Sequence, residues 1–84
     1  MADVKNALKF KEAGNAAFNS KDYIIAIQHF SSAIEADPND HVFYSNRSAC
    51  YAILEQYDKA LEDGEIWVNL KPDWVRGYLR KGLA

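Results

Sequence analysis

Apolar residues recur along this chain at steps of three and four, the spacing that places side chains on one face of an α-helix. The pattern is clearest between about Asp22 and Ala36, where the apolar positions are Tyr23, Ala26, Ile27, Phe30, Ala33 and Ile34. The same spacing predicts further helices over about Val4–Asn19, Val42–Leu54 and Tyr57–Leu70, and a fifth from near Trp74 to the chain end. No alternation is long enough to indicate a strand, so the pattern predicts an all-α chain.

Turn-forming residues separate these predicted helices. Asp37-Pro38-Asn39-Asp40 stops one helix and starts the next, and Lys71-Pro72-Asp73 repeats that signal, because Pro cannot continue a helix and Asn and Asp support turns and caps. Asp22 and Asp73 are the expected N-caps of the helices that follow them. Short connections of this kind favour antiparallel helix pairs stacked side by side.

The helix pairs form a repeat of about 34 residues. If the first unit starts at Ala7, a set of small, aromatic and proline positions returns in the second unit: Gly14, Ala26, Phe30, Ala33 and Pro38 correspond to Ser48, Ala60, Gly64, Trp67 and Pro72. The expected units are 7–40, 41–74 and a partial 75–84. Such a period predicts a helix–turn–helix solenoid, and the concave face of a solenoid usually binds other chains.

Length, charge and cysteine usage narrow the class of protein. The 84 residues predict one small domain, 1–84, and a net charge of −2 gives no general attraction to nucleic acid or to an anionic membrane. A single cysteine, Cys50, excludes an intrachain disulfide and favours a reducing compartment. The first residues have no apolar segment of signal-peptide type, and no segment has the apolar length of a membrane span. We therefore expect a cytoplasmic module with no nucleic-acid or membrane partner.

Several runs of residues carry a family resemblance. These runs are 14–18 (GNAAF), 41–49 (HVFYSNRSA) and 71–74 (KPDW), together with Gly77-Tyr78 and Arg80. In phase and in order, they resemble the tetratricopeptide repeat (TPR) family, and within it the N-terminal TPR domain of the heat-shock-organising (Hop, or stress-inducible protein) co-chaperones. The resemblance covers nearly the whole chain. It implies a right-handed TPR solenoid with two full repeats plus the first helix of a third, and an adaptor without enzymatic activity.

Five polar residues are the candidate binding site. Lys11 and Asn15 share one face of the first predicted helix, Arg76 and Arg80 share one face of the fifth, and Asn46 lies on the third. A single Lys or Arg on a helix is usually just solvated, so the prediction depends on all five positions together. Three cations and two amides suit a peptide's C-terminal carboxylate beside an acidic side chain.

The resemblance gives this constellation a specific meaning. All five positions match the dicarboxylate clamp of certain TPR domains, which binds the Glu-Glu-Val-Asp tails of the seventy- and ninety-kilodalton heat-shock chaperones. Similarity to the first Hop domain favours the seventy-kilodalton class. Arg76 stands where Lys is more usual in that family, which keeps the charge and changes the geometry.

No other chemistry is indicated. His29 and His41 have no nearby Cys or acidic pair at metal-ligand spacing, so a metal site is not expected. Cys50 lacks a base in its local motif, so it is expected to pack as a small hydrophobe. We expect no metal, no cofactor and no catalytic residue, since the sequence contains neither a nucleophile–base signature nor a glycine-rich phosphate loop.

Unusual apolar residues leave a second function open. Four residues depart from the repeat pattern: Ile24, Ile25, Ile66 and Trp67. In addition, the half repeat would expose an apolar side of the fifth helix that includes Leu79 and Leu83. Ordinary sequence drift would explain them. The alternative is a truncated or engineered TPR module whose main property is homo-oligomeric self-assembly.

Overall fold

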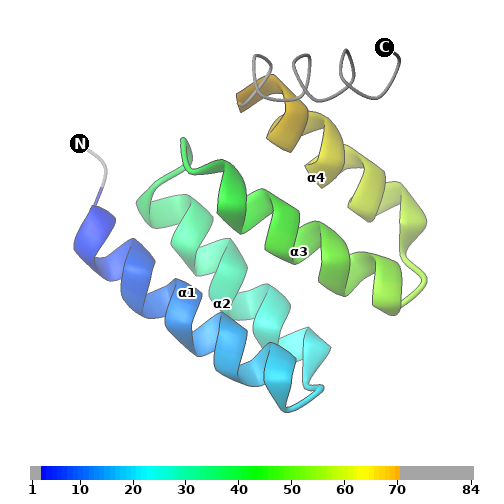
Figure 1. Cartoon of the computed structure of the whole chain (residues 1–84), viewed down its shortest axis with the longest axis horizontal. Helices are drawn as coiled ribbons and strands as arrows, with labels where there is room; N and C mark the ends of the chain where they lie inside the picture. Colours follow the sequence, from blue (N-terminus) through cyan, green and yellow to red (C-terminus); the bar gives the residue numbers. More distant parts are fainter. Residues whose placement is uncertain (1–2, 71–84) are drawn as a thin grey trace, which may run out of the picture.

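The computed structural model describes residues 3–70, and these form four α-helices joined by short turns (Figure 1). Helix α1 spans Val4–Asn19, α2 spans Tyr23–Ala36, α3 spans His41–Ile53 and α4 spans Tyr57–Leu70. The predicted helix limits agree with these bounds to within one residue. The predicted fifth helix and the partial third unit lie outside the described residues.

The helices are arranged as two antiparallel pairs stacked in chain order. Helix α1 packs along α2, α3 packs along α4, and α2 forms the contact between the pairs (Figure 1). This arrangement confirms the predicted all-α fold of stacked helix pairs.

Aspartates begin two of these helices. Asp3 Oδ1 accepts a hydrogen bond from Asn6 N at 3.2 Å, and Asp40 Oδ1 accepts one from Val42 N at 3.0 Å. Asp22 does occupy the N-cap position of α2, but its side chain makes no capping hydrogen bond. Its backbone N–H instead donates to Ala17 O at 2.8 Å and completes the end of α1, so one residue serves both helix ends.

The two inter-helix turns within the pairs have the same geometry. In each, one non-glycine residue has a left-handed backbone: Lys21 after α1, with φ 63°, and Glu55 after α3, with φ 62°. In the first turn, Lys21 N donates to Phe18 O at 2.9 Å and the following N–H, of Asp22, donates to Ala17 O at 2.8 Å. In the second turn, Glu55 N donates to Ala52 O at 3.0 Å and the following N–H, of Gln56, donates to Tyr51 O at 2.8 Å. This is the Schellman pattern of helix ends. Lys21 and Glu55 hold the same position in their units, so the repeat extends to the turn conformation.

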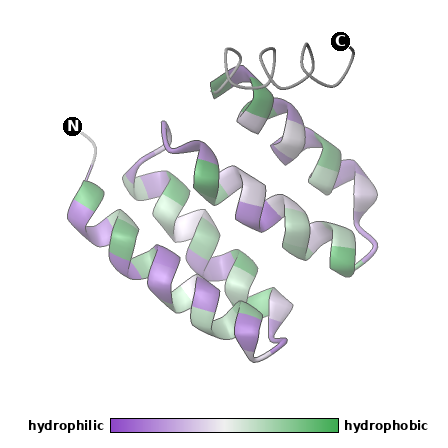
Figure 2. Ribbon diagram, viewed as in Figure 1, coloured by the Kyte–Doolittle hydropathy of each residue, from purple (hydrophilic) through white to green (hydrophobic). Residues whose placement is uncertain are grey.

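The core consists of two apolar clusters. Ala7, Ala33 and Phe43 form one, and Ala26, Phe30 and Cys50 form the other. Each described helix carries both apolar and polar residues (Figure 2). This is typical of a helix that packs against its neighbours on one side and faces solvent on the other. Both clusters contain residues of α2 and α3, so the contact between the two pairs is part of the core.

Candidate functional site

Two of the predicted site residues line one pocket. The pocket has a volume of about 180 Å³ and is lined by Asn15 and Phe18 of α1, Phe30 of α2, and Asn46 and Ala49 of α3. Residues far apart in the sequence therefore meet where three helices converge. The pocket combines two side-chain amides with two aromatic rings, so it can donate hydrogen bonds to an acceptor and contact an apolar group.

Lys11 lies one helical turn before Asn15 on α1. It is partly buried, whereas Asn15 is exposed. Because residues four apart share a helix face, the Lys11 ammonium is carried on the same side of α1 as the Asn15 amide. Arg76 and Arg80, the remaining two predicted site residues, lie outside the described residues.

A close helix contact shapes the floor of the pocket. A Cβ atom on Gly14 would lie 2.5 Å from Cε1 of Phe30, a distance that real Cβ atoms do not show. Glycine at this position therefore lets the fully buried Phe30 ring lie against α1 beside Asn15. The ring then forms part of the pocket lining.

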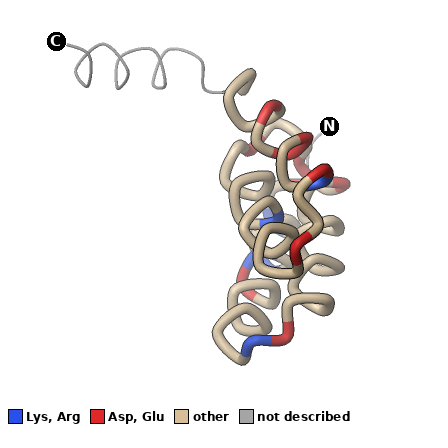
Figure 3. Tube along the Cα trace, turned by 90° about the vertical axis from the view of Figure 1, so that its right-hand side faces the viewer, with Lys and Arg blue, Asp and Glu red and all other residues tan. Residues whose placement is uncertain are grey.

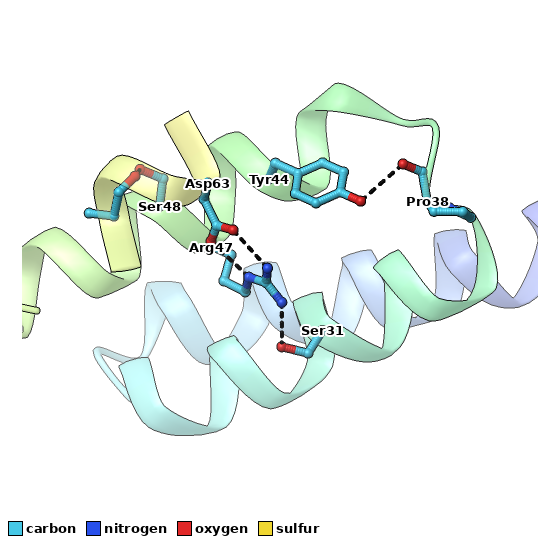
Figure 4. A network of polar contacts seen from close by, with 7 residues as sticks. Ser31, Pro38, Tyr44, Arg47, Ser48 and Asp63 are labelled. Atoms are coloured by element: carbon cyan, nitrogen blue, oxygen red, sulfur yellow. Dashed lines mark hydrogen bonds and ion pairs between the residues drawn. The ribbon is translucent and has the colours of Figure 1, made fainter. Parts of the chain in front are cut away.

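Sequence reasoning missed a polar network next to Asn46. The Arg47 guanidinium donates from Nε to Asp63 Oδ2 at 2.8 Å and from Nη2 to Asp63 Oδ1 at 2.7 Å, and Nη1 donates to Ser31 Oγ at 3.1 Å (Figure 4). Arg47 thus joins α2, α3 and α4. The hydrogen bonds to Asp63 raise the pKa of Arg47, although burial of the guanidinium opposes this effect. The side chain of Asp63 is 3% exposed and that of Arg47 is 20% exposed.

Two further hydrogen bonds tie α3 to its neighbours. Tyr44 donates its hydroxyl to Pro38 O at 3.0 Å (Figure 4). Ser48 donates its hydroxyl to Ala60 O at 2.7 Å. Burial raises the pKa of Tyr44. No local spacing in the sequence marks the Arg47–Asp63 pair, because its two members lie sixteen residues apart on different helices.

The charged side chains are unevenly distributed over the helices. Helix α1 carries Lys5, Lys9 and Lys11 against Glu12. Helix α4 carries four acids and Lys59, so acidic positions predominate along it (Figure 3). Lys11 lies one helical turn from Asn15, so a cation shares a helix face with one of the two amides that line the pocket.

Potential metal ligands and the single cysteine are the other chemically notable features of residues 3–70. In that range, no group of three or more His, Cys, Asp or Glu residues could hold a metal ion. Cys50 is fully buried, and burial raises the pKa of its thiol, as expected for a packed hydrophobe. Among the four described helices, none is long and apolar enough to cross a membrane.

The residues predicted for self-association are partly placed. Ile24 is 62% exposed, and Ile25 and Ile66 are exposed to a smaller extent. Trp67 is half-buried and lines a hollow on α4 with Leu61, Gly64 and Val68. Leu79 and Leu83 lie outside the described residues.

Comparison with known proteins gives a consistent set of relatives. Residues 1–80 match the family described as serine/threonine-protein kinase BSK1-like, TPR repeats. The Protein STIP1 homolog of Dictyostelium discoideum is 49% identical over 98% of this chain, and the heat shock protein sti1 homolog of Schizosaccharomyces pombe is 51% identical over 93% of it. The chain spans only 14% and 13% of the lengths of these two relatives.

A solved structure shares the fold. The first TPR of Spaghetti (RPAP3), bound to the HSP90 peptide SRMEEVD, has a TM-score of 0.85 and 32% identity, and the match covers 98% of this chain and 65% of that one. The arrangement of the helices described here is therefore that of a domain solved with a peptide in place.

Proposed function

Because this chain belongs to the tetratricopeptide repeat family, we propose that it is a non-catalytic adaptor domain that binds the acidic Glu-Glu-Val-Asp tail of heat-shock chaperones. The observation that carries the proposal is the pocket in which Asn15 of α1 and Asn46 of α3 meet, one helical turn from Lys11. The names of the relatives support it, since they are co-chaperones of the STI1 type.

The chemistry of the pocket fits a chain terminus. Each asparagine has an amide with two N–H donors and brings no negative charge of its own, so both can hydrogen-bond to a carboxylate without repelling it. Lys11 adds a positive charge on the same side of α1. In the proposed dicarboxylate clamp, these three residues hold the terminal carboxylate and the acidic last side chain together with Arg76 and Arg80.

The aromatic part of the lining contributes in a different way. Phe18 and Phe30 give the pocket an apolar surface next to the two amides. A valine that precedes the terminal acid could pack there while its own carbonyl and the terminal carboxylate remain near the polar groups. The proposed ligand is therefore an aliphatic residue followed by an acid with a free carboxylate, which both chaperone tails supply. We favour the seventy-kilodalton chaperone, acting in the cytoplasm, as the partner.

A matched pair of lysine substitutions tests the proposal. Lys11→Ala should weaken binding of a Glu-Glu-Val-Asp peptide by roughly tenfold, because it removes a charge-assisted contact of about 1.4 kcal/mol. Lys9→Ala removes the same charge from an exposed position of α1 and should change affinity by less than about twofold. Equal effects of the two substitutions, measured by isothermal titration calorimetry, would mean that only net charge matters and that no clamp exists.

Self-assembly is the second candidate function, and the exposure of Ile24 favours it. Exposed aliphatic side chains at the start of α2 offer apolar surface that a second copy could cover. Sedimentation equilibrium of the whole chain and of Trp67→Ala with Leu83→Glu tests this directly. A chain that remains monomeric and folded across the micromolar range excludes it.

A further inference from the structure

Asn46 and Arg47 are adjacent residues of α3 whose side chains make different contacts. Successive residues of an α-helix point about 100° apart, so one rotation of the helix fixes both directions. Asn46 lines the pocket with Asn15. The Arg47 guanidinium instead bonds to Asp63 on α4 and to Ser31 on α2 (Figure 4).

We propose that the Arg47–Asp63–Ser31 network is the positioning device that sets the rotation of α3 and so aims the Asn46 amide at the ligand. This inference rests on the proposed function, because it assigns Asn46 to the peptide site. Arg47, Asp63 and Ser31 are positioning residues in this account, and the peptide contacts none of them.

The geometry of the network suits this role. A bidentate guanidinium–carboxylate pair holds two parallel hydrogen bonds in one plane, which fixes orientation as well as distance. The bond from Nη1 to Ser31 adds a third direction. The rings of Tyr44 and Tyr51 lie on the same helix, with their centroids 5.9 Å and 5.8 Å from the Arg47 guanidinium carbon. Because Asp63 and Ser31 lie on the two neighbouring helices, α3 cannot turn about its axis without breaking the hydrogen bonds that Arg47 makes to them. The two rings move with α3 and only hold the guanidinium in place.

The small net contribution of a buried ion pair to stability also favours a role in orienting the helix. A buried ion pair is often no more stabilising than apolar residues of the same volume, because both charges lose their hydration. Apolar packing can hold two helices together, but it permits small rotations that a fork of hydrogen bonds resists. In this fold, the resisted rotation is the one that moves Asn46.

The test is a double-substitution cycle in the full chain, with calorimetric titration of a Glu-Glu-Val-Asp peptide. Asp63→Asn should weaken binding by roughly fivefold in the parent and by less than about twofold in the Asn46→Ala background, since coupled positions are not additive. Glu62→Gln, which removes the same charge from an exposed position of α4, is the control and should leave affinity within about twofold. If Asp63→Asn weakens peptide binding by the same factor in the parent and in the Asn46→Ala background, the inference is wrong.

A milder substitution covers the case in which Asp63→Asn fails to fold. Ser31→Ala removes only the third hydrogen bond and leaves the ion pair in place. We expect it to shift the side-chain NH₂ resonances of Asn46 in a ¹⁵N–¹H spectrum and to leave those of Asn15 unchanged. Unshifted Asn46 resonances would overturn the positioning role.

Different results would overturn the proposed peptide site and the positioning role of the network. If Asn46→Ala alone leaves peptide affinity unchanged, the proposed site is wrong and the inference falls with it. If Asn46→Ala weakens binding measurably while Asp63→Asn and Ser31→Ala do not affect it, the proposed function stands and the positioning role is wrong.

Discussion

The ring of Phe30 lies in the space that a side chain on Gly14 would need: a Cβ there would come within 2.5 Å of Phe30 Cε1. This contact joins α1 to α2 in the buried core and supports the pocket that Asn15 lines. The equivalent pair in the second unit is reversed in size, with Ser48 in place of Gly14 and Gly64 in place of Phe30. A hydroxyl fits there and bonds to Ala60 O at 2.7 Å.

The glycines of helices α1 and α4 should therefore respond in opposite ways to the same substitution. Gly14→Ala forces the buried Phe30 ring to move and should lower the free energy of unfolding by about 2 kcal/mol, a typical cost of overpacking. Gly64→Ala adds a methyl group that meets nothing within 4 Å in residues 3–70 apart from its chain neighbours and the nearby backbone of its own helix. It should raise the free energy of unfolding by up to about 1 kcal/mol through helix propensity. Urea denaturation of both variants measures the difference, and a stabilising Gly14→Ala would contradict the packing described.

The left-handed residues at the two turns provide a second prediction. Lys21 and Glu55 occupy the position after a helix end where glycine is most favourable, because a Cβ raises the energy of this backbone. Lys21→Gly and Glu55→Gly should each raise the free energy of unfolding, by about 0.5 kcal/mol after the extra chain entropy of glycine is subtracted. Lys21→Ala and Glu55→Ala, which keep the Cβ, serve as controls. A loss of stability in both glycine variants would show that the turns are not left-handed.

Much of the fold could be predicted from the sequence, because the helices are specified by local signals. The apolar period, Pro38 and the small residues of the repeat located every described helix to within one residue. The left-handed turns were not predicted, since Lys21 and Glu55 are not the glycine or asparagine that usually marks such a position.

The sequence predicted the candidate site only as far as residue spacing along a helix shows which side chains share a face of that helix. Spacing alone placed Lys11 and Asn15 on one face of α1, and the stacking of helices then brought Asn46 to Asn15. The Arg47–Asp63 pair joins helices through a tertiary contact, and no local pattern around Arg47 distinguishes it from a solvated arginine. Arg76 and Arg80 stay predictions from the resemblance.

The buried cysteine provides a probe of the core between the helix pairs. Cys50 is fully buried beside Phe30, and burial raises its thiol pKa, so less thiolate is present at a given pH than in a free cysteine. Its reaction with a thiol reagent at pH 7.5 should be at least about a hundredfold slower than in the urea-unfolded chain, because reaction requires local or global opening. Equal rates in the folded and unfolded chain would contradict the burial.

A negative charge introduced at the pocket distinguishes a carboxylate ligand from a neutral one. Asn46→Asp keeps the side-chain size but places an anion beside the ligand's carboxylate, so affinity for a Glu-Glu-Val-Asp peptide should fall by roughly a hundredfold or more. Ser45→Asp, which adds the same charge at an exposed position of α3, should have a much smaller effect. Circular dichroism of both variants should match the parent, and unchanged affinity in folded Asn46→Asp would remove this residue from the site.

The most direct test of the central claim compares two peptides that differ only at the terminal carboxylate. Calorimetric titration of the chain with a Glu-Glu-Val-Asp peptide as the free acid, and with the same peptide amidated at its C-terminus, isolates one negative charge and its hydrogen bonds. If the pocket between Asn15 and Asn46 captures a chain terminus, the amidated peptide should bind at least roughly tenfold more weakly, and the difference should shrink as salt is added. Equal affinity of the two peptides would contradict a carboxylate clamp.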